Sequence, residues 1–326
     1  MPLWWICLRI AVVTPAYNAA PTIADAIRSV LGQTHRDLRL VVVDDGSTDT
    51  TAAVAASFAD PRLALIWQCN AGVAAARNRG MAAADGDALL FLDADDWLAP
   101  TALATLAAAL DAAPDAVVAA GPSVRVDAEG RPMEHPRQPR PAAPHALLAR
   151  LVVQNQFVNG GHLLIRRAAA RQAGTFRAGV SYGEDWEYFV RLALLGPFAV
   201  ATTPEPLLFV RSRPDGAYRR LATNPDAFAP CMAAIFGNPD LAARFGVARL
   251  AALRRLAEAE NAWVIGRELV RNGRAREGRR WLARSVTAAP SLRRAALLAA
   301  AHALPVLPDA VRGPFRRYAT PDAKPA

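Results

Sequence analysis

Short apolar runs alternate with amphipathic segments along the first 112 residues of the chain. The runs are rich in Val, Ile and Leu, which is typical of buried β-strands, and they cover residues 9–14, 38–43, 62–67 and 87–92. Between them, apolar side chains recur at helical spacing, as in Ile23, Ile27 and Leu31. Helices are therefore predicted over residues 22–31, 49–58, 72–84 and 100–112.

This alternation predicts βαβ units and a mostly parallel sheet, which places the chain in the α/β class. Ligands of such sheets bind beyond the carboxyl ends of the strands. Clusters of polar residues follow the predicted strands of this chain. The pattern therefore predicts a binding site at that edge of the sheet.

The pattern changes further along the chain. A Pro- and Arg-rich stretch predicts a loop over residues 129–144, followed by a glycine-interrupted strand over 157–166, a helix over 184–195 and a strand over 207–210. From about residue 239 only helices are predicted, and a helix–turn–helix hairpin over residues 264–288 is broken at Asn272-Gly273. We therefore predict two domains, comprising residues 1–223 and 224–326.

Composition supports a globular chain with an uneven charge. The 326 residues are 53% hydrophobic and 21% charged, which favours a packed core over disorder. The net charge is +9, and the whole positive excess lies in residues 244–326, which indicates an anionic partner. Because this region lacks the signature of a zinc finger or of a DNA-binding helix-turn-helix motif, an anionic membrane surface is favoured over nucleic acid. A solvated basic helix face explains the charge equally well.

The cysteines and the apolar segments of the sequence indicate the cellular compartment in which the protein is expected. Cys7, Cys69 and Cys231 are too few and too far apart for a disulfide framework or a zinc site, so a reducing compartment is expected. Residues 1–10 are apolar but contain Arg9 and lack a cleavage site, and no apolar run is long enough to span a membrane. We expect a cytoplasmic protein that can associate peripherally with the inner face of the cytoplasmic membrane.

An acidic cluster closes the fourth predicted strand, in the segment FLDADDW. Strand alternation sends the side chains of Asp93 and Asp95 in the same direction, and Asp96 follows them. Carboxylates this close repel one another when ionised, and a hard divalent cation would relieve the repulsion. A solvated turn, with Asp96 capping the next helix, is the alternative.

Four other clusters carry candidate chemistry. Asp44 lies in DDGSTD after the second strand, Tyr17 in TPAYN after the first, and Arg77 in NAGVAAARNRG near the end of the third. A carboxylate suits a base or ribose, an aromatic ring suits stacking on a base, and arginine suits phosphate. Asp185, in GEDWE, could accept a proton. A turn, a partly buried tyrosine, a surface ion pair and an acidic helix start are the respective alternatives.

Taken together, the clusters resemble glycosyltransferase family 2, the inverting enzymes of the GT-A fold. The order and spacing of TPAYN, VVDDGSTD, NAGVAAARNRG, FLDADDW, GGHLLIRR and GEDWE carry this resemblance over residues 9 to about 213. It implies a Rossmann-like mixed sheet flanked by helices, with a C-terminal helical extension that the resemblance does not cover. It also implies a nucleotide-sugar donor, with a UDP-sugar favoured.

On the donor side, the resemblance implies that Asp93 and Asp95 hold Mn²⁺ or Mg²⁺ against the diphosphate. It implies that Asp44 accepts a hydrogen bond from the base, that Thr14, Pro15 and Tyr17 line the base pocket, and that Arg77 lies near the nucleotide.

On the acceptor side, the resemblance implies that Asp185 is the general base that activates a hydroxyl of a glycan or lipid-linked glycan. Glu184, Trp186, Gly160 and Gly161 would then shape the acceptor site. The product would be a cell-surface polysaccharide.

One feature departs from the family pattern. Arg213 stands where many relatives carry a histidine after the last strand, and arginine cannot ligate a metal although it can bind a diphosphate.

A nucleotidyltransferase is disfavoured because residues 14–18 lack a glycine-rich phosphate loop. The remaining alternative is a catalytically degenerate nucleotide-sugar-binding or scaffold protein of the same fold.

Overall fold

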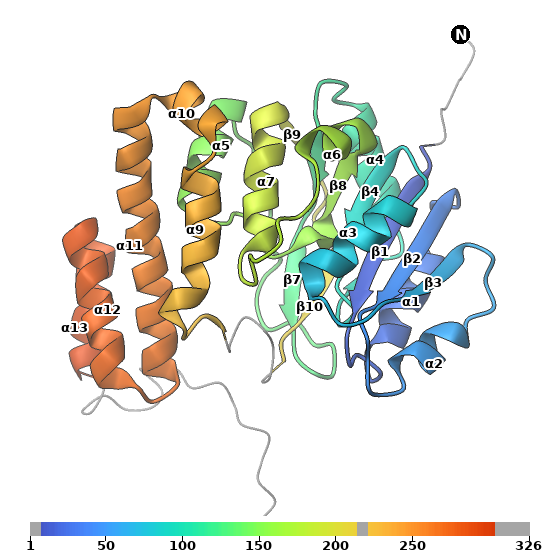
Figure 1. Ribbon diagram of the computed structural model, residues 1–326, viewed down its shortest axis with the longest axis horizontal. Coiled ribbons are helices and arrows are strands. Elements are labelled where there is room, and N and C mark those ends of the chain that lie inside the picture. Colours follow the sequence, from blue (N-terminus) through green and yellow to red (C-terminus); the bar gives the residue numbers. More distant parts are fainter. Residues whose placement is uncertain (1–7, 214–220, 304–326) are drawn as a thin grey trace, which may run out of the picture. The chain divides into compact units, whose positions relative to one another are not determined.

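The computed structural model describes residues 8–213 and 221–303. Its larger sheet has the strand order β3-β2-β1-β4-β8-β6-β9 (Figure 1). The strands are β1 (Ile10–Ala16), β2 (Leu38–Asp44), β3 (Leu63–Trp67), β4 (Ala88–Phe91), β6 (Val118–Ala120), β8 (Leu163–Arg166) and β9 (Phe198–Val200). The first four are parallel, as predicted, whereas β8 is antiparallel to both β4 and β6. The sheet is therefore mixed, and its parallel half carries the predicted site.

Helices cover both faces of this sheet. Helices α1 (Ile23–Leu31) and α4 (Ala102–Asp111) share one hydrophobic core with the alternate strand residues Val12, Val42 and Leu90. The opposite face is covered by α3 (Val73–Ala83), where Gly80 comes so close to Val13 and Val43 that a Cβ would clash. Because β1 and β2 are apolar on both sides, they form the buried centre of a three-layer unit.

A second, three-stranded sheet follows the acidic cluster. It has the order β5-β10-β7, with β5 (Trp97–Leu98), β7 (Ser123–Val126) and β10 (Leu208–Arg211). Phe209 lies opposite Trp97 in this sheet, and their rings stack with centroids 5.3 Å apart. This sheet therefore joins the end of the acidic cluster to a strand more than 100 residues away.

Four further helices of the described residues belong to the α/β part, and two of them were predicted. They are α2 (Thr51–Ala56), α5 (Pro144–Val153), α6 (Arg167–Ala173) and α7 (Glu184–Leu195), of which α2 and α7 correspond to predicted helices. The strand predicted over residues 157–166 is wrong in its first half. Asn159 Oδ1 accepts a hydrogen bond from Gly161 N–H and starts a 3₁₀ turn, η1 (Gly160–His162), so that only Leu163–Arg166 is strand.

The later part of the chain is helical, as predicted. It contains η2 (Pro225–Phe228), α9 (Ala229–Phe236), α10 (Pro239–Phe245), α11 (Val247–Arg271), α12 (Ala275–Ala288) and α13 (Leu292–Ala303). The predicted hairpin is α11–α12, which turns at Asn272 and Gly273, where Gly273 has φ +82°. Gly266 and Gly278 let the two helices touch, because a Cβ on Gly266 would lie 2.9 Å from the Gly278 carbonyl oxygen.

Contacts between Cα atoms divide the chain into two compact units. One contains residues up to Leu148 together with Gln156–Ser212, and the other contains Ala149–Asn155 and the residues from Arg213 onward. The domain boundary at residue 224 stays a prediction. Within residues 8–213 and 221–303, no helix is long and apolar enough to cross a membrane.

Candidate active site

The loops after β1 and β2 are tied to each other at the carboxyl edge of the sheet. Asn18, at φ 48°, accepts a hydrogen bond from Thr48 N–H at 2.8 Å and donates its own N–H to the Ser47 hydroxyl. Tyr17 beside it is 52% exposed, whereas Thr14 and Pro15 are buried within β1. An exposed ring at a strand end is available to a flat ligand, and contact of Tyr17 with a base stays a prediction.

The two neighbouring aspartates of DDGSTD have different surroundings. Asp44 is 1% exposed, and its Oδ1 accepts the Ser47 N–H at 3.0 Å. Asp45 accepts three hydrogen bonds, from the Gln68 side chain and from the N–H groups of Ala71 and Gly72. Asp45 therefore fixes the loop between β3 and α3, and this structural role was missed because the spacing of the motif does not distinguish its two aspartates.

The acidic cluster after β4 also contains carboxylates with different surroundings. Asp93 and Asp95 are partly exposed, whereas Asp96 is 2% exposed. Asp96 accepts hydrogen bonds from Asn159 Nδ2 at 2.6 Å and from Arg211 N–H at 2.9 Å. Burial, together with the negative charges of Asp95 and Asp93, raises the pKa of Asp96 well above its ordinary value. The next helix begins after Thr101, so the part of the alternative in which Asp96 caps that helix is wrong.

Arg77 connects the donor-side and acceptor-side candidates. Its Nη2 donates to Asp93 Oδ1 and its Nη1 to Glu184 Oε1, both at 2.8 Å. The guanidinium is 5% exposed and lies 5.4 Å from the centroid of the Phe176 ring. Burial lowers the pKa of Arg77, but the carboxylates of Asp93 and Glu184 outweigh burial and raise it. The surface ion pair proposed as the alternative for this arginine is therefore wrong, because the guanidinium is buried.

Aromatic packing brings α7 to this place. Tyr188 on α7 packs on Phe176 with ring centroids 4.3 Å apart, and both rings contact Phe91 of β4 edge-on. The first turn of α7, which contains Glu184 and Asp185, consequently lies beside α3 and the carboxyl end of β4. Burial and the neighbouring Glu184 raise the pKa of Asp185 to about 7, although Arg77 opposes the shift. A carboxylate with this pKa is suited to accept a proton near neutral pH.

The other acceptor-side candidates are buried. Trp186 is 5% exposed, and a Cβ on Gly160 would lie 3.0 Å from the Phe91 carbonyl oxygen. Gly161 likewise leaves no room for a side chain, because a Cβ would lie 2.7 Å from Leu208. These residues pack the turn η1 and helix α7 against the sheets, and their contact with an acceptor stays a prediction. Arg213 stands at the position of the family histidine, and the residues that follow it, 214–220, lie outside the described residues. Its role toward the donor stays a prediction.

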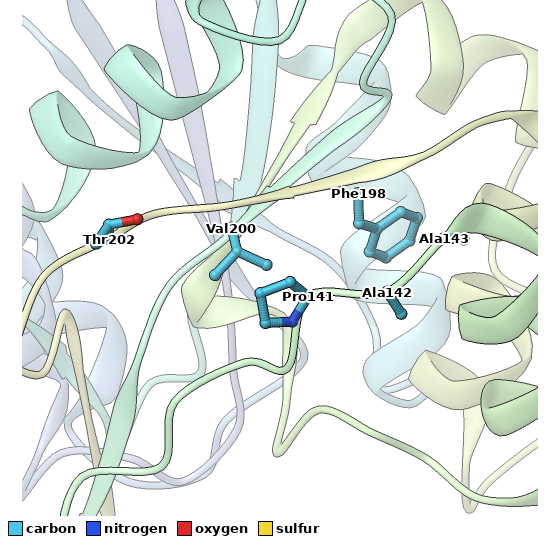
Figure 2. A pocket seen from close by; sticks show the side chains of 6 residues that line it. All are labelled: Pro141, Ala142, Ala143, Phe198, Val200 and Thr202. Carbon is cyan, nitrogen blue, oxygen red and sulfur yellow. The ribbon is translucent and has the colours of Figure 1, made fainter.

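A hollow elsewhere on the protein lacks the chemistry of a reaction site. It has a volume of about 550 Å³ and lies along β9, at the far end of the sheet from β1 and β2. Figure 2 shows that its lining is formed by Pro141, Ala142, Ala143, Phe198, Val200 and Thr202. Because none of these side chains titrates, the carboxylate cluster around Arg77 is the better candidate for the active site.

The mixed sheet with helices on both faces has the GT-A fold of nucleotide-diphospho-sugar transferases, and a helical C-terminal region follows it in the chain. The protein is similar to S. aureus TarS, residues 1–349, solved in complex with UDP-GlcNAc, with a TM-score of 0.60, 19% identity and coverage of 94% of this chain and 89% of that chain. It is also similar to a mannosyltransferase from Pyrobaculum calidifontis in complex with GDP-Man and Mn²⁺, with a TM-score of 0.57, 22% identity and coverage of 95% and 84%.

Sequence similarity gives the family. Residues 11–174 match the family described as glycosyl transferase family 2, and this chain belongs to that family. The succinoglycan biosynthesis protein ExoO of Rhizobium meliloti is 34% identical over 186 residues, which cover 53% of this chain and 52% of ExoO. The matches to the first curated relatives, from Escherichia coli and Nostoc, cover 29% and 30% of those proteins.

Proposed function

We propose that this protein is an inverting glycosyltransferase that moves a sugar from a nucleoside-diphosphate sugar to a hydroxyl of a glycan or lipid-linked glycan. The observation that carries the proposal is the ion-pair geometry around Arg77. One buried guanidinium lies within hydrogen-bond distance of the carboxylates of both Asp93 and Glu184, and Asp185 adjoins Glu184. A donor-side carboxylate and a candidate base thus share one site.

In the proposed reaction, Asp185 accepts the proton of the acceptor hydroxyl. The hydroxyl oxygen forms a bond to the anomeric carbon while the bond from that carbon to the diphosphate oxygen breaks. The nucleoside diphosphate leaves with the bonding electrons, and the configuration inverts. A pKa near 7 keeps a substantial fraction of Asp185 ionised at neutral pH, because the carboxyl is half ionised at its pKa.

The donor set around Asp93 and Asp95 fits Mn²⁺ or Mg²⁺. Carboxylate oxygens are the ligands that hard divalent cations prefer, and Mg²⁺ commonly takes one or two carboxylates plus substrate phosphates. Across residues 8–213 and 221–303, no three His, Cys, Asp or Glu side chains form a ready cage, so donor phosphates would complete the coordination. When bound, the metal would offset the negative charge that develops on the departing diphosphate.

The donor and acceptor are proposed from similarity and from the exposed ring of Tyr17. One structural neighbour was solved with UDP-GlcNAc and another with GDP-Man, so both nucleotides are candidates, and a UDP-sugar is favoured. ExoO is named for succinoglycan biosynthesis, which supports a polysaccharide acceptor. In this proposal Asp44 and Tyr17 contact the base, while Glu184, Trp186, Gly160 and Gly161 shape the acceptor site.

Release of nucleoside diphosphate tests this function. UDP-, dTDP- and GDP-sugars are incubated with the protein and Mn²⁺ or Mg²⁺, with and without EDTA. At least one donor is expected to be turned over, and EDTA and Asp185→Asn should each remove the activity. If wild type and Asp185→Asn release the nucleotide equally slowly while nucleotide still binds, the protein is instead a degenerate nucleotide-sugar-binding protein.

The basic helix α12 is proposed as a membrane-facing surface. Arg276, Arg280 and Arg284 are exposed and follow one another at four-residue intervals, so they form one stripe. The buried residues Leu282 and Ser285 lie on the opposite side of the helix, and Ser285 bonds to α11. Such a stripe suits anionic lipid headgroups, with about 1 kcal/mol expected for each arginine. This surface would bring the protein close to a lipid-linked acceptor at the cytoplasmic membrane.

Vesicles containing one-third phosphatidylserine test the membrane surface. Replacing the three arginines of the stripe with Gln should weaken salt-sensitive binding about 100-fold. A matched variant replaces Arg36, Arg79 and Arg171, which are exposed in the α/β part, and should change binding little. Equal losses in the two variants would show that net charge alone, rather than this stripe, determines binding.

A further inference from the structure

Arg211, the last residue of β10, makes four hydrogen bonds to three separate segments of the protein. Its Nε donates to the carbonyl oxygen of Asp95 at 3.1 Å, and its Nη1 to that of Ala128 at 3.2 Å. Its Nη2 donates to Oδ2 of Asp25 on α1 at 3.0 Å, and its backbone N–H donates to Oδ1 of Asp96 at 2.9 Å. The side chain is only 15% exposed, so these contacts replace most of its hydration.

The guanidinium also lies on an aromatic platform. Its central carbon is 4.9 Å from the centroid of the Trp97 ring, and the Trp97 ring stacks on Phe209. Because Trp97 and Phe209 face each other across β5 and β10, the platform is fixed by the small sheet. A planar guanidinium can stack and donate in its plane at the same time, which a lysine ammonium cannot do.

The segment that Arg211 holds contains the proposed metal ligands. Residues 92–96 lie between β4 and β5 and have no regular secondary structure beyond a turn. The turn is closed by a hydrogen bond from Asp96 N–H to the Asp93 carbonyl oxygen at 3.1 Å. Arg211 makes two hydrogen bonds to this turn. Its side-chain Nε donates to the carbonyl oxygen of Asp95, and its backbone N–H donates to the carboxylate of Asp96.

We propose that Arg211 is a positioning residue that presets the turn carrying Asp93 and Asp95 for binding the nucleoside diphosphate and its cation. This inference rests on the function proposed above. Arg211 stabilises the turn by contacts to its backbone, so the turn is ordered before the donor arrives. Donor binding then does not have to supply the free energy of ordering it.

Direct binding of substrate by Arg211 is a less suitable role. Three of its donor groups are used within the protein, and Trp97 lies against its face. A cavity of about 450 Å³ adjoins it, with Asp25, Arg28 and Glu129 in its lining. These charges already pair within the protein, because Asp25 bonds to both Arg28 and Arg211, and Glu129 bonds to Arg131.

The first test compares Arg211→Gln with Arg28→Gln in the full chain. Arg28 also pairs with Asp25 but makes no hydrogen bond to residues 93–97 among the contacts described, so it is the matched control. In ligand-free protein, amide hydrogen exchange of the peptide containing residues 92–98 is expected to speed up about tenfold in Arg211→Gln only. Unchanged exchange there, in a variant that folds, would overturn the proposal.

The second test measures binding of UDP and GDP in the presence of Mn²⁺ by calorimetry. Arg211→Gln is expected to raise Kd about tenfold and the donor KM similarly, while kcat at saturating donor stays within about threefold. Arg211→Lys should recover only part of the affinity. A fall in kcat with unchanged Kd would contradict a positioning role and indicate contact with the reacting atoms.

The two tests separate this inference from the proposed function. If the wild type binds neither nucleotide, the proposed function fails, but hydrogen exchange still decides whether Arg211 orders the turn. If Arg211→Gln does not fold, Asp25→Ala is used instead, because it removes only the hydrogen bond that Arg211 Nη2 donates to Asp25. That variant should raise the nucleotide Kd about threefold relative to Arg28→Gln, and equal Kd values would overturn the inference.

Discussion

Arg77 Nη1 lies 2.8 Å from Glu184 Oε1, although 107 residues separate the two in the chain. The same guanidinium binds Asp93, so it neutralises part of the negative charge at the junction of α3, α7 and β4. Without it, the carboxylates of Asp93, Glu184 and Asp185 would repel one another in a largely water-excluded place. The ion pairs therefore serve the assembly of the site as well as its chemistry.

Replacement of Arg77 should affect both stability and activity. Arg77→Gln leaves the partly buried carboxylates of Asp93 and Glu184 without their counter-charge, and we expect the free energy of unfolding to fall by about 3 kcal/mol. Nucleotide release should fall at least about 100-fold. Chemical denaturation and the donor assay measure the two effects. Arg79→Gln, an exposed neighbour on the same helix, should change neither, and equal losses in both variants would contradict the central role of Arg77.

The pH profile should report the titration of Asp185. Because the base acts in its ionised form and its pKa is raised to about 7, kcat/KM should fall below that pH. The fall should approach tenfold per pH unit in the acidic limb. Profiles recorded from pH 5 to 9 measure this limb. A flat profile over the same range, with the donor still turned over, would exclude Asp185 as the base.

His162 should make the fold sensitive to acid. Its Nδ1 lies 2.7 Å from the Gly121 carbonyl oxygen, and burial lowers its pKa to about 4. The unfolded chain, with an ordinary value near 6.5, therefore binds more protons between pH 6.5 and 4, and stability falls as pH falls through that window. The loss should reach about 3 kcal/mol. Urea denaturation at pH 7, 5.5 and 4 measures it.

The variant His162→Gln isolates this contribution. Its side-chain amide can donate to the Gly121 carbonyl oxygen but does not titrate. The decline of stability from pH 7 to pH 4 should therefore be smaller than in wild type by most of that amount. A decline as steep as the wild-type one would show that other groups cause the acid sensitivity.

The neighbouring Asp44 and Asp45 should give opposite phenotypes. Asp45→Ala removes the acceptor of three hydrogen bonds from Gln68, Ala71 and Gly72, so the free energy of unfolding should fall by about 2–3 kcal/mol. Asp44→Asn can retain the bond from Ser47 N–H, so stability should change little while nucleotide binding weakens. Denaturation and calorimetry on both variants measure this. A reversed pattern would exchange the roles of the two residues.

The sequence predicted the parallel half of the sheet because the patterns there are unambiguous. Each of the strands β1 to β4 is a short run of mostly apolar residues rich in Val, Ile or Leu, and the polar clusters follow them. The start and end of α7 were also predicted, since Glu184 is preceded by a glycine and Leu195 is followed by one. Local sequence signals were sufficient for elements whose own hydrophobic pattern matches both their secondary structure and their burial in the fold.

Long-range contacts could not be predicted in the same way. The two- to four-residue strands β5, β6, β7 and β9 exist only through their partners, and their sequences have no period of their own. The 3₁₀ turn at Gly160 lies against Phe91, and the role proposed for Arg211 depends on three segments that are distant from it in sequence. No spacing rule within one segment reports such contacts.

The hydrogen-bonding of Asp45 and Asp96 affects how mutations at this site should be interpreted. Asp45 directly follows Asp44, and Asp96 directly follows Asp95; Asp44 and Asp95 both have a proposed role in binding. Asp45 and Asp96 are themselves buried and accept hydrogen bonds from residues of neighbouring loops. Loss of activity at either position would therefore not identify a reacting group. A mutational survey of this protein that scores activity alone would count both as essential carboxylates although the proposed chemistry requires neither, and only parallel measurements of folding would separate the two kinds.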